Sequence, residues 1–344
     1  MAISATTKWL LHKFTDIDKA RFKKHLQIMV QESGRSRLTL MVDMFRCFVR
    51  YGTGYTDYFR GNFIDLTDAE KETWCTAKKF HKIIHYLNNP SFIGILHDKG
   101  MFDNFFNKYI RREFCDLRYC TKEEFMNFMA AKHTVFAKDP TGECGHNISK
   151  IVLSEVSDLN ALYDDLLAKG QLVLENTIVQ SREVNEINPC VVNSFRVVTL
   201  YKDHHAQVIA NGFRVNQDDT TVIGCTNDLY FTLGEDGKIS SNVIDDYGQI
   251  YDRHPLTGKI FSDVKIYGVT EAFLMCCEAA EKLPQVRYIG WDVAFTPLGP
   301  VIIEGNEYPG YGFLQFHKLN GSRTGHLKTI ADVLGDEMKN IDLS

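Results

Sequence analysis

The sequence predicts an α+β protein, in which a helical N-terminal region precedes a larger part made of helices and antiparallel strands. Stretches such as 20–33 and 76–88 repeat apolar residues at three- and four-residue spacing, which is the spacing of one helical face. After residue 190, alternating apolar runs separated by short polar turns predict β-hairpins. No glycine-rich dinucleotide fingerprint follows a predicted strand, so a Rossmann domain is not indicated.

We expect three structural units along the chain. Residues 1–95 form the helical region, in which Thr67 or Asp68 caps a helix whose first turn is acidic. Residues 96–180 form a small α+β subdomain with a glycine loop. Residues 181–344 form a C-terminal subdomain with a metal site.

Capping residues and turns order the elements of the small subdomain. A helix is entered at 98–99, and a second helix begins after Thr121, a residue type that favours the N-cap. Short β-like runs over 133–138 and 148–153 flank the glycine loop. A further amphipathic helix ends at Gly170, because glycine favours the left-handed conformation that closes many helices.

The C-terminal subdomain is expected to consist mainly of hairpins. Runs 190–201 and 205–215 are separated by a short polar turn, and a helix over 267–283 leads into a last hairpin over 290–306. The turn of that last hairpin is expected near Leu298, within a stretch rich in proline and glycine.

Composition narrows the choice of partners. The 344 residues carry a net charge of −5, so charge gives no global case for binding nucleic acid. Nine cysteines without paired spacing fit reduced thiols, and we expect a cytoplasmic protein. No apolar stretch approaches the roughly 20 residues of a membrane span, so no stable membrane insertion is expected. The sequence leaves open whether the protein forms a homodimer.

The last hairpin carries polar residues where apolar ones would pack better. Asp292 lies in its first strand, and Glu304 and Asn306 end its second strand. Residues two apart on a strand share a face, so Glu304 and Asn306 project together, and pairing places Asp292 opposite Glu304. Facing carboxylates repel each other, whereas Mg²⁺ takes such oxygen ligands. We therefore prefer metal binding to the alternative of solvated carboxylates at a strand end.

A lysine and a glycine-containing loop mark the small subdomain. Lys138 ends one β-like run, and the loop with Gly142 and Gly145 leads into the next. Such a turn can present backbone N–H groups to a polyphosphate, with Lys138 as a point charge. An ordinary hairpin loop with an exposed lysine is the alternative, and this feature alone favours it.

Two arginines lie in successive apolar strands. Arginine in such a strand is costly unless it meets an anion or a carboxylate. Arg196 and Arg214 are therefore expected either to contact a phosphate and a substrate carboxylate or to form structural salt bridges.

In this order, the features resemble the ATP-grasp superfamily, and most closely its sugar-transfer-associated members. The resemblance runs from about Asp98 to Gly312, and its most specific stretch is "GWDVAFTPLGPVIIEGN". It implies an ATP-grasp fold, in which two α+β subdomains grip ATP, and it implies ATP and two Mg²⁺ ions as cofactors.

The resemblance also assigns roles to residues. Lys99 and Lys138 would contact ATP phosphates, and Arg196 would face the reacting phosphate. Arg196, Arg214 and Lys138 are the candidate catalytic residues. The implied binding residues are Gly142 and Gly145 in the loop, Glu175, Asn176, Thr177 and Ile178 at an adenine-binding hinge, Glu183 for the ribose, and Asp292, Glu304 and Asn306 for Mg²⁺.

The resemblance implies a ligase that joins a small carboxylate to an amine through an acyl phosphate, for example an amino acid to a sugar or sugar acid in polysaccharide biosynthesis. A phosphotransferase acting on a hydroxyl and a non-catalytic nucleotide-binding protein remain alternatives. Two departures from the family stand out. The loop has only two glycines, and the N-terminal region is helical where many relatives have a Rossmann-like domain.

Overall fold

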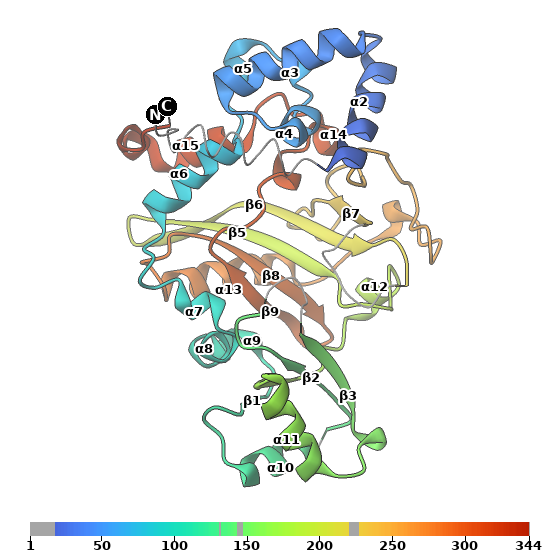
Figure 1. The fold of residues 1–344 in the computed structure, drawn as a ribbon, viewed down its shortest axis with the longest axis vertical. Coiled ribbons are helices and arrows are strands. Elements are labelled where there is room, and N and C mark those ends of the chain that lie inside the picture. The colour runs from blue at the N-terminus through green and yellow to red at the C-terminus, as the bar shows by residue number, and fades with distance from the viewer. Residues whose placement is uncertain (1–17, 131, 143–146, 220–226, 344) are drawn as a thin grey trace, which may run out of the picture.

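The computed structural model describes residues 18–130, 132–142, 147–219 and 227–343, and its helices and antiparallel sheets confirm the α+β class. Figure 1 shows the N-terminal helices at one end, a five-stranded sheet in the middle and a four-stranded sheet at the other end. The site predicted from the sequence draws on both sheets.

The N-terminal region is helical, as predicted. Thr67 and Glu70 form a capping box, so Thr67 is the N-cap and Asp68 the first helical residue. The helices of this region are α2 (Lys19–Ser33), α3 (Arg37–Tyr51), α4 (Tyr55–Arg60), α5 (Asp68–Glu72) and α6 (Ala77–Leu87), with the short 3₁₀ helix η1 (Phe63–Asp65).

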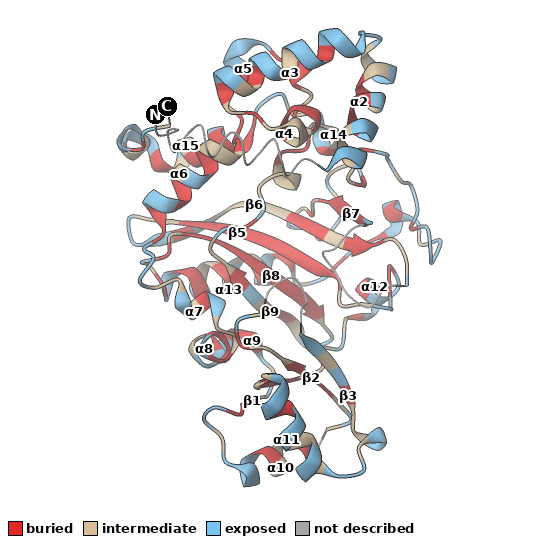
Figure 2. Ribbon diagram, in the orientation of Figure 1, coloured by how far each residue is buried: buried red, intermediate tan, exposed pale blue. Residues whose placement is uncertain are grey.

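The large sheet has the strand order β7-β6-β5-β8-β9, and all neighbouring strands are antiparallel. Helix α13 covers one of its faces, and the N-terminal helices lie over the other (Figure 1). The central strands are buried along most of their length (Figure 2). The elements are β5 (Ser194–Lys202), β6 (His205–Asn216), β7 (Asp228–Phe231), β8 (Tyr288–Thr296), β9 (Gly299–Asn306) and α13 (Val269–Glu281), with α12 (Arg182–Asn185) before β5 and η3 (Phe261–Asp263) before α13.

The small sheet has the order β1-β4-β2-β3 and is also antiparallel. Helices α10 and α11 pack on one face of it around Phe125, Met129 and Leu166. Gly170 ends α11 in the left-handed conformation, as predicted. The strands are β1 (Phe114–Asp116), β2 (Thr134–Lys138), β3 (Ile148–Val152) and β4 (Val173–Asn176); the helices are α10 (Lys122–Ala130) and α11 (Leu159–Lys169), with η2 (Leu153–Glu155).

Three short helices connect the N-terminal region to the small sheet, and the chain ends in helices that return to the N-terminal region. The connecting helices are α7 (Gly94–His97), α8 (Lys99–Phe105) and α9 (Asn107–Ile110). The C-terminal elements are η4 (Phe313–Gln315), α14 (His317–Asn320), α15 (His326–Leu334) and η5 (Gly335–Asn340). Within the described part of the chain, no helix has the length and apolar character needed to cross a membrane.

Candidate functional site

Strand pairing in the last hairpin brings the predicted carboxylates together. Asp292 of β8 lies directly opposite Glu304 of β9, as predicted. The register shifts next to this pair and leaves Ile303 as an extra residue in β9. A bulge of this kind bends its strand and redirects neighbouring side chains. The amide of Asn306 donates to the Glu304 carboxylate at 3.3 Å, so all three polar side chains gather at one end of the hairpin.

One face of the large sheet carries the polar residues. Phe195 and Val197 pack into the core beneath α13, so Arg196 between them points to the opposite face. Arg214 and Asp292 share that face, because the neighbours on either side of each also belong to this core. The N-terminal helices lie over the same face (Figure 1).

Both strand arginines meet carboxylates. Arg196 donates from Nε to Asp292 at 2.6 Å and from Nη2 at 2.9 Å, and both side chains are buried. Arg214 donates to Asp228 at 2.7 Å. Salt bridges are thus present for both arginines, and that of Arg196 includes a predicted metal ligand.

The two facing carboxylates differ in acidity. Burial alone would raise the pKa of Asp292, but the Arg196 guanidinium, together with the Arg214 charge, holds that pKa below its usual range. Glu304 keeps contact with solvent. Even so, the surrounding protein partly desolvates its carboxyl group, which raises the pKa of Glu304, and the Asp292 charge raises it further.

A divalent cation fits this donor set, because its charge would offset the repulsion between the facing carboxylates. In the described ranges, no group of three or more His, Cys, Asp or Glu side chains is placed to hold a metal. A cation at this hairpin would therefore rely on Asp292, Glu304, the Asn306 amide and ligands from outside the protein.

Alternation along the small sheet places Lys138 and Glu175 on its uncovered side. Val135 and Ala137 of β2 belong to the core under α10 and α11, so Lys138 points to the opposite face. On β4, Leu174 belongs to the same core and its neighbour Glu175 points away from it. The Lys138 ammonium donates to the Glu175 carboxylate at 2.7 Å.

A buried arginine joins this pair to the hairpin. The Arg112 guanidinium lies 2.8 Å from Glu175 and donates to Asp103 at 3.0 Å. It also donates to the carbonyls of Ile302 and Ile303, at 2.9 and 3.1 Å. Arg112 therefore links the small sheet to the bulge beside Glu304.

The charges in this network shift one another's protonation. Burial alone would raise the pKa of Glu175, but Lys138 and Arg112 together lower it to about 2. Burial, and next the Glu175 charge, raise the pKa of Asp103 to about 7. Glu175 is thus ionised at neutral pH, and Lys138 and Arg112 both stabilise its charge.

Lys99 approaches the same place from α8. Asp98 caps this helix, as expected for a helix entered at 98–99, and the Lys99 ammonium donates to the carbonyl of Gly142. Burial, and next Lys138, lower the pKa of Lys99, while Glu304 and Glu175 act in the opposite direction. Lys99 therefore lies within electrostatic reach of both Lys138 and the hairpin residue Glu304. Gly145 falls outside the described residues.

The hinge segment is held by hydrogen bonds to several other parts of the chain. The backbone N–H of Asn176 donates to the carbonyl of Glu113, and the side-chain oxygen of Asn176 accepts the N–H of Thr177, both at 3.0 Å. The Thr177 hydroxyl donates to the carbonyl of Thr134, and Glu183 accepts the N–H of Tyr267 at 3.5 Å. Ile178 is half-buried. Adenine and ribose binding by the hinge residues stays a prediction.

Sequence reasoning missed Arg112 and Asp103. The stretch "YIRREF" shows two adjacent arginines but not which one is buried. Arg111 pairs with Glu271 at the surface, whereas Arg112 has only 6% of its side chain exposed. The sequence offered one weak signal for a buried arginine, namely a basic residue between a predicted helix and a predicted strand.

Comparison with known proteins gives one sequence family and several distant structures. The family model described as sugar-transfer associated ATP-grasp matches residues 137–330. No curated protein matches the chain significantly.

The chain is also similar to solved structures. One is the ATP-grasp ligase PsnB complexed with minimal precursor (16% identity, 72% of this chain and 62% of that chain, TM-score 0.42). Another is the VanG D-Ala:D-Ser ligase from Enterococcus faecalis (13% identity, 70% and 62%, TM-score 0.42). A third is an L-amino acid ligase from Bacillus licheniformis (10% identity, 71% and 49%, TM-score 0.42).

The chain spans less than two thirds of the length of each of these three structures. With TM-scores of 0.42, they add no weight to the assignment. The family match covers more than half of the chain, including Lys138, both strand arginines and the whole last hairpin. The protein belongs to the sugar-transfer-associated ATP-grasp family.

Proposed function

We propose that the protein is an ATP-dependent ligase that joins a carboxylate to an amine through an acyl phosphate. The observation that supports this most is the position of Lys99 between Lys138 and the hairpin. Lys99 comes from the entry helix and Lys138 from the small sheet, and the Lys99 ammonium senses the charges of both Lys138 and Glu304. Such a grouping suits a polyphosphate held between cations.

The lysines and the two strand arginines have different tasks in this proposal. The two lysines bind phosphate oxygens of ATP and hold the γ-phosphate near the hairpin. Arg196 uses Nε and Nη2 for Asp292, so contact with the transferred phosphoryl group falls to Nη1. Arg214 orients the substrate carboxylate from the neighbouring strand.

The donor set of the hairpin suits magnesium. Asp292, Glu304 and Asn306 would hold Mg²⁺, which supplies positive charge beside the phosphate oxygens when it is bound. The Arg196 pair keeps Asp292 ionised and so ready to act as a ligand.

The substrate carboxylate attacks the γ-phosphate, and ADP leaves. The amine then displaces phosphate from the acyl phosphate, which forms the amide. No nucleophile from the protein is needed, because the substrate carboxylate carries the phosphoryl group. The family description favours substrates from sugar transfer, so we propose that an amino acid is attached to a sugar or a sugar acid in polysaccharide biosynthesis.

The test is product formation by the full chain with ATP, Mg²⁺ and a pool of amino acids and sugar acids. ADP release and mass spectrometry of the products are the readouts. We expect a condensation product that has lost one water. Glu304→Gln should lower its formation by about 100-fold or more, because a metal ligand and its charge are lost.

Glu278→Gln is the matched control, since Glu278 pairs with Lys108 at the surface of α13. A product that gains a phosphate instead would move the assignment to a phosphotransferase. Failure of the wild-type chain both to turn over and to bind ATP would overturn the proposal.

A further inference from the structure

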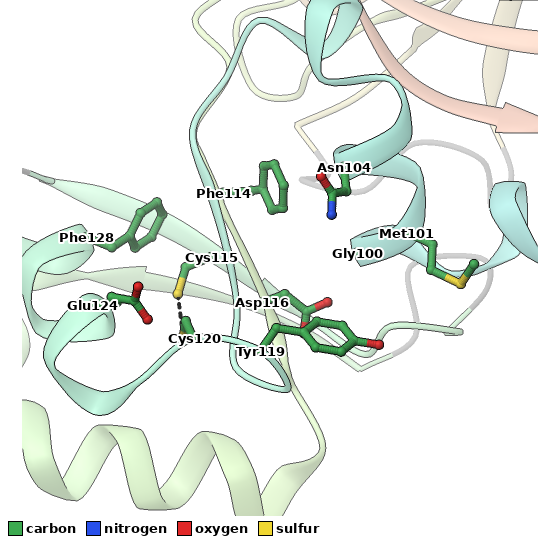
Figure 3. A pocket seen from close by; sticks show the side chains of 10 residues that line it. All are labelled: Gly100, Met101, Asn104, Phe114, Cys115, Asp116, Tyr119, Cys120, Glu124 and Phe128. Atoms are coloured by element: carbon green, nitrogen blue, oxygen red, sulfur yellow. Dashed lines mark hydrogen bonds between the residues drawn. The ribbon is translucent and has the colours of Figure 1, made fainter. Parts of the chain in front are cut away.

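Two thiols lie in contact on the small subdomain, beside a cavity that residues of α8 also line. Cys115 in β1 and Cys120 in the turn that follows are five residues apart, and their sulfurs are 2.9 Å apart. Figure 3 shows both side chains pointing toward one another beside a cavity. Nothing in the proposed ligase reaction uses them.

The turn between the cysteines holds the sulfurs together. The carbonyl of Asp116 accepts the N–H groups of Tyr119 and Cys120 at 3.0 and 2.9 Å. The Arg118 guanidinium, which lies within this turn, donates hydrogen bonds to the carboxylates of Asp116 and Asp98. Since a disulfide needs a sulfur separation of about 2.05 Å, the pair has to approach by less than about 1 Å.

A cavity lined by both cysteines gives a small molecule access to the pair. Its volume is about 490 Å³, within the range of small-molecule sites, and its walls include Met101, Phe114, Tyr119 and Phe128. Cys120 is half-buried at the cavity wall, whereas Cys115 has 7% of its surface exposed.

The two thiols therefore differ in reactivity. Burial, and next the hydrogen bond to Cys120, raise the pKa of the Cys115 thiol. Because the thiolate is the attacking form, Cys120 is the thiol that reacts first with a reagent from solution.

We propose that Cys115 and Cys120 are a redox modification site, which low-molecular-weight disulfides convert into an intramolecular disulfide. The Cys120 thiolate attacks one sulfur of the reagent, and the first reagent thiolate leaves and takes up the proton that Cys120 released. Cys115 then loses its proton and attacks the Cys120 sulfur. The second reagent thiolate leaves with that proton, so the protein loses two hydrogens and the reagent is reduced to two thiols.

The test uses the full reduced chain and oxidised glutathione, followed by alkylation of free thiols and tryptic digestion. Trypsin cuts after Arg112, Arg118 and Lys122, so the two cysteines fall into separate peptides, 113–118 and 119–122. A disulfide joins these peptides in a way that reduction reverses, whereas a missed cleavage after Arg118 gives one peptide that reduction does not separate. We expect the joined species to be the main form of both peptides and to disappear after treatment with dithiothreitol.

The exposed Cys190 serves as an internal control. Separate alkylated peptides under conditions in which Cys190 carries glutathione would overturn the proposal, and so would a glutathione adduct that persists on Cys120. In Cys115→Ser the adduct on Cys120 should persist, because the resolving thiol is gone. If that variant does not fold, the time course of the wild-type chain decides, since the adduct should precede the joined peptides.

Discussion

Charged side chains at the site are held in pairs, and the partner of each one decides what a substitution does. Lys138 neutralises the buried Glu175 and faces the side of the small sheet that α10 and α11 leave uncovered. Lys99 contributes a second positive charge nearby. At the residue scale, removal of one cation should therefore affect an anionic ligand more than it affects the fold.

We expect Lys138→Met to weaken ATP binding by about 10- to 100-fold, the worth of one or two charge-assisted hydrogen bonds. Isothermal titration with ATP and Mg²⁺ measures this. Lys150→Met is the control, because Lys150 is an exposed lysine on the neighbouring strand β3. Equal losses in the two variants would contradict the role of Lys138.

The buried His326 predicts how stability depends on pH. Burial lowers the pKa of His326 to about 4, and its ring forms a hydrogen bond with the Tyr288 hydroxyl. The unfolded chain binds a proton near pH 6.5, so between about pH 6.5 and 4 the unfolded state holds more protons than the folded state. The contribution of His326 is therefore complete above pH 6.5 and is lost as the pH falls, by up to about 3 kcal/mol.

Urea unfolding at pH 7 and pH 5 tests this. His326→Gln should lose less stability than wild type between the two pH values, although it starts from a lower free energy of unfolding. His205→Gln, a change at an exposed histidine, should follow wild type. An unchanged pH dependence in His326→Gln would rule out this residue as the source.

At the scale of elements, the bulge in β9 is held by a residue from another part of the fold. Arg112 donates to the two carbonyls at the bulge and also meets Asp103 and Glu175. Its removal leaves the buried Asp103 without its cation and the buried Glu175 with Lys138 alone.

We expect Arg112→Met to lower the free energy of unfolding by about 3–5 kcal/mol, the usual cost of breaking a buried ion pair. Arg111→Met, the same change one residue earlier, should cost about 1 kcal/mol or less, because Arg111 pairs with Glu271 at the surface. Denaturant unfolding measures both variants. Similar losses would show that the network contributes no more than a surface pair.

Sequence patterns predicted elements and registers better than contacts between elements. Thr67, Thr121 and Gly170 cap helices as expected, since capping depends on local chemistry. The prediction that Asp292 faces Glu304 was based on a turn centred near Leu298. The observed turn pairs Thr296 with Gly299, and the extra residue in β9 is what brings Glu304 opposite Asp292. The bulge beside them was not predicted, because one extra apolar residue leaves no mark in an apolar run. The roles of the site residues as ligands stay predictions.

At the scale of the whole molecule, the N-terminal and C-terminal parts of the chain form one core. Leu327, Ile330 and Leu334 of α15 pack against Phe80 and Ile83 of α6. A heptad-like pattern shows that each helix has an apolar face but cannot show that the two faces meet. The helical character of the N-terminal region was therefore predictable, and its packing partner was not.

One buried amide connects these parts. The Gln315 side chain accepts the N–H groups of Cys75 and His326 at 3.1 Å and donates to the Cys75 carbonyl at 2.6 Å. We expect Gln315→Leu to cost about 2–4 kcal/mol, because it leaves buried backbone groups without partners. Gln249→Leu at an exposed position is the control.

Thermal unfolding of the wild-type chain should show one transition for both the N-terminal helices and the sheets. A separate early transition would contradict a shared core.

The contacts of Arg112 also fix the order in which the site can be completed during synthesis. Its two carbonyl partners lie 190 and 191 residues further along the chain. At a translation rate of about 5–20 residues per second, that interval takes about 10–40 s. During that time Asp103 and Glu175 are already available to the arginine, but its two carbonyl partners are missing. Because β9 must be synthesised before Arg112 can bind both carbonyls, closing this network is among the last folding events of the nascent chain.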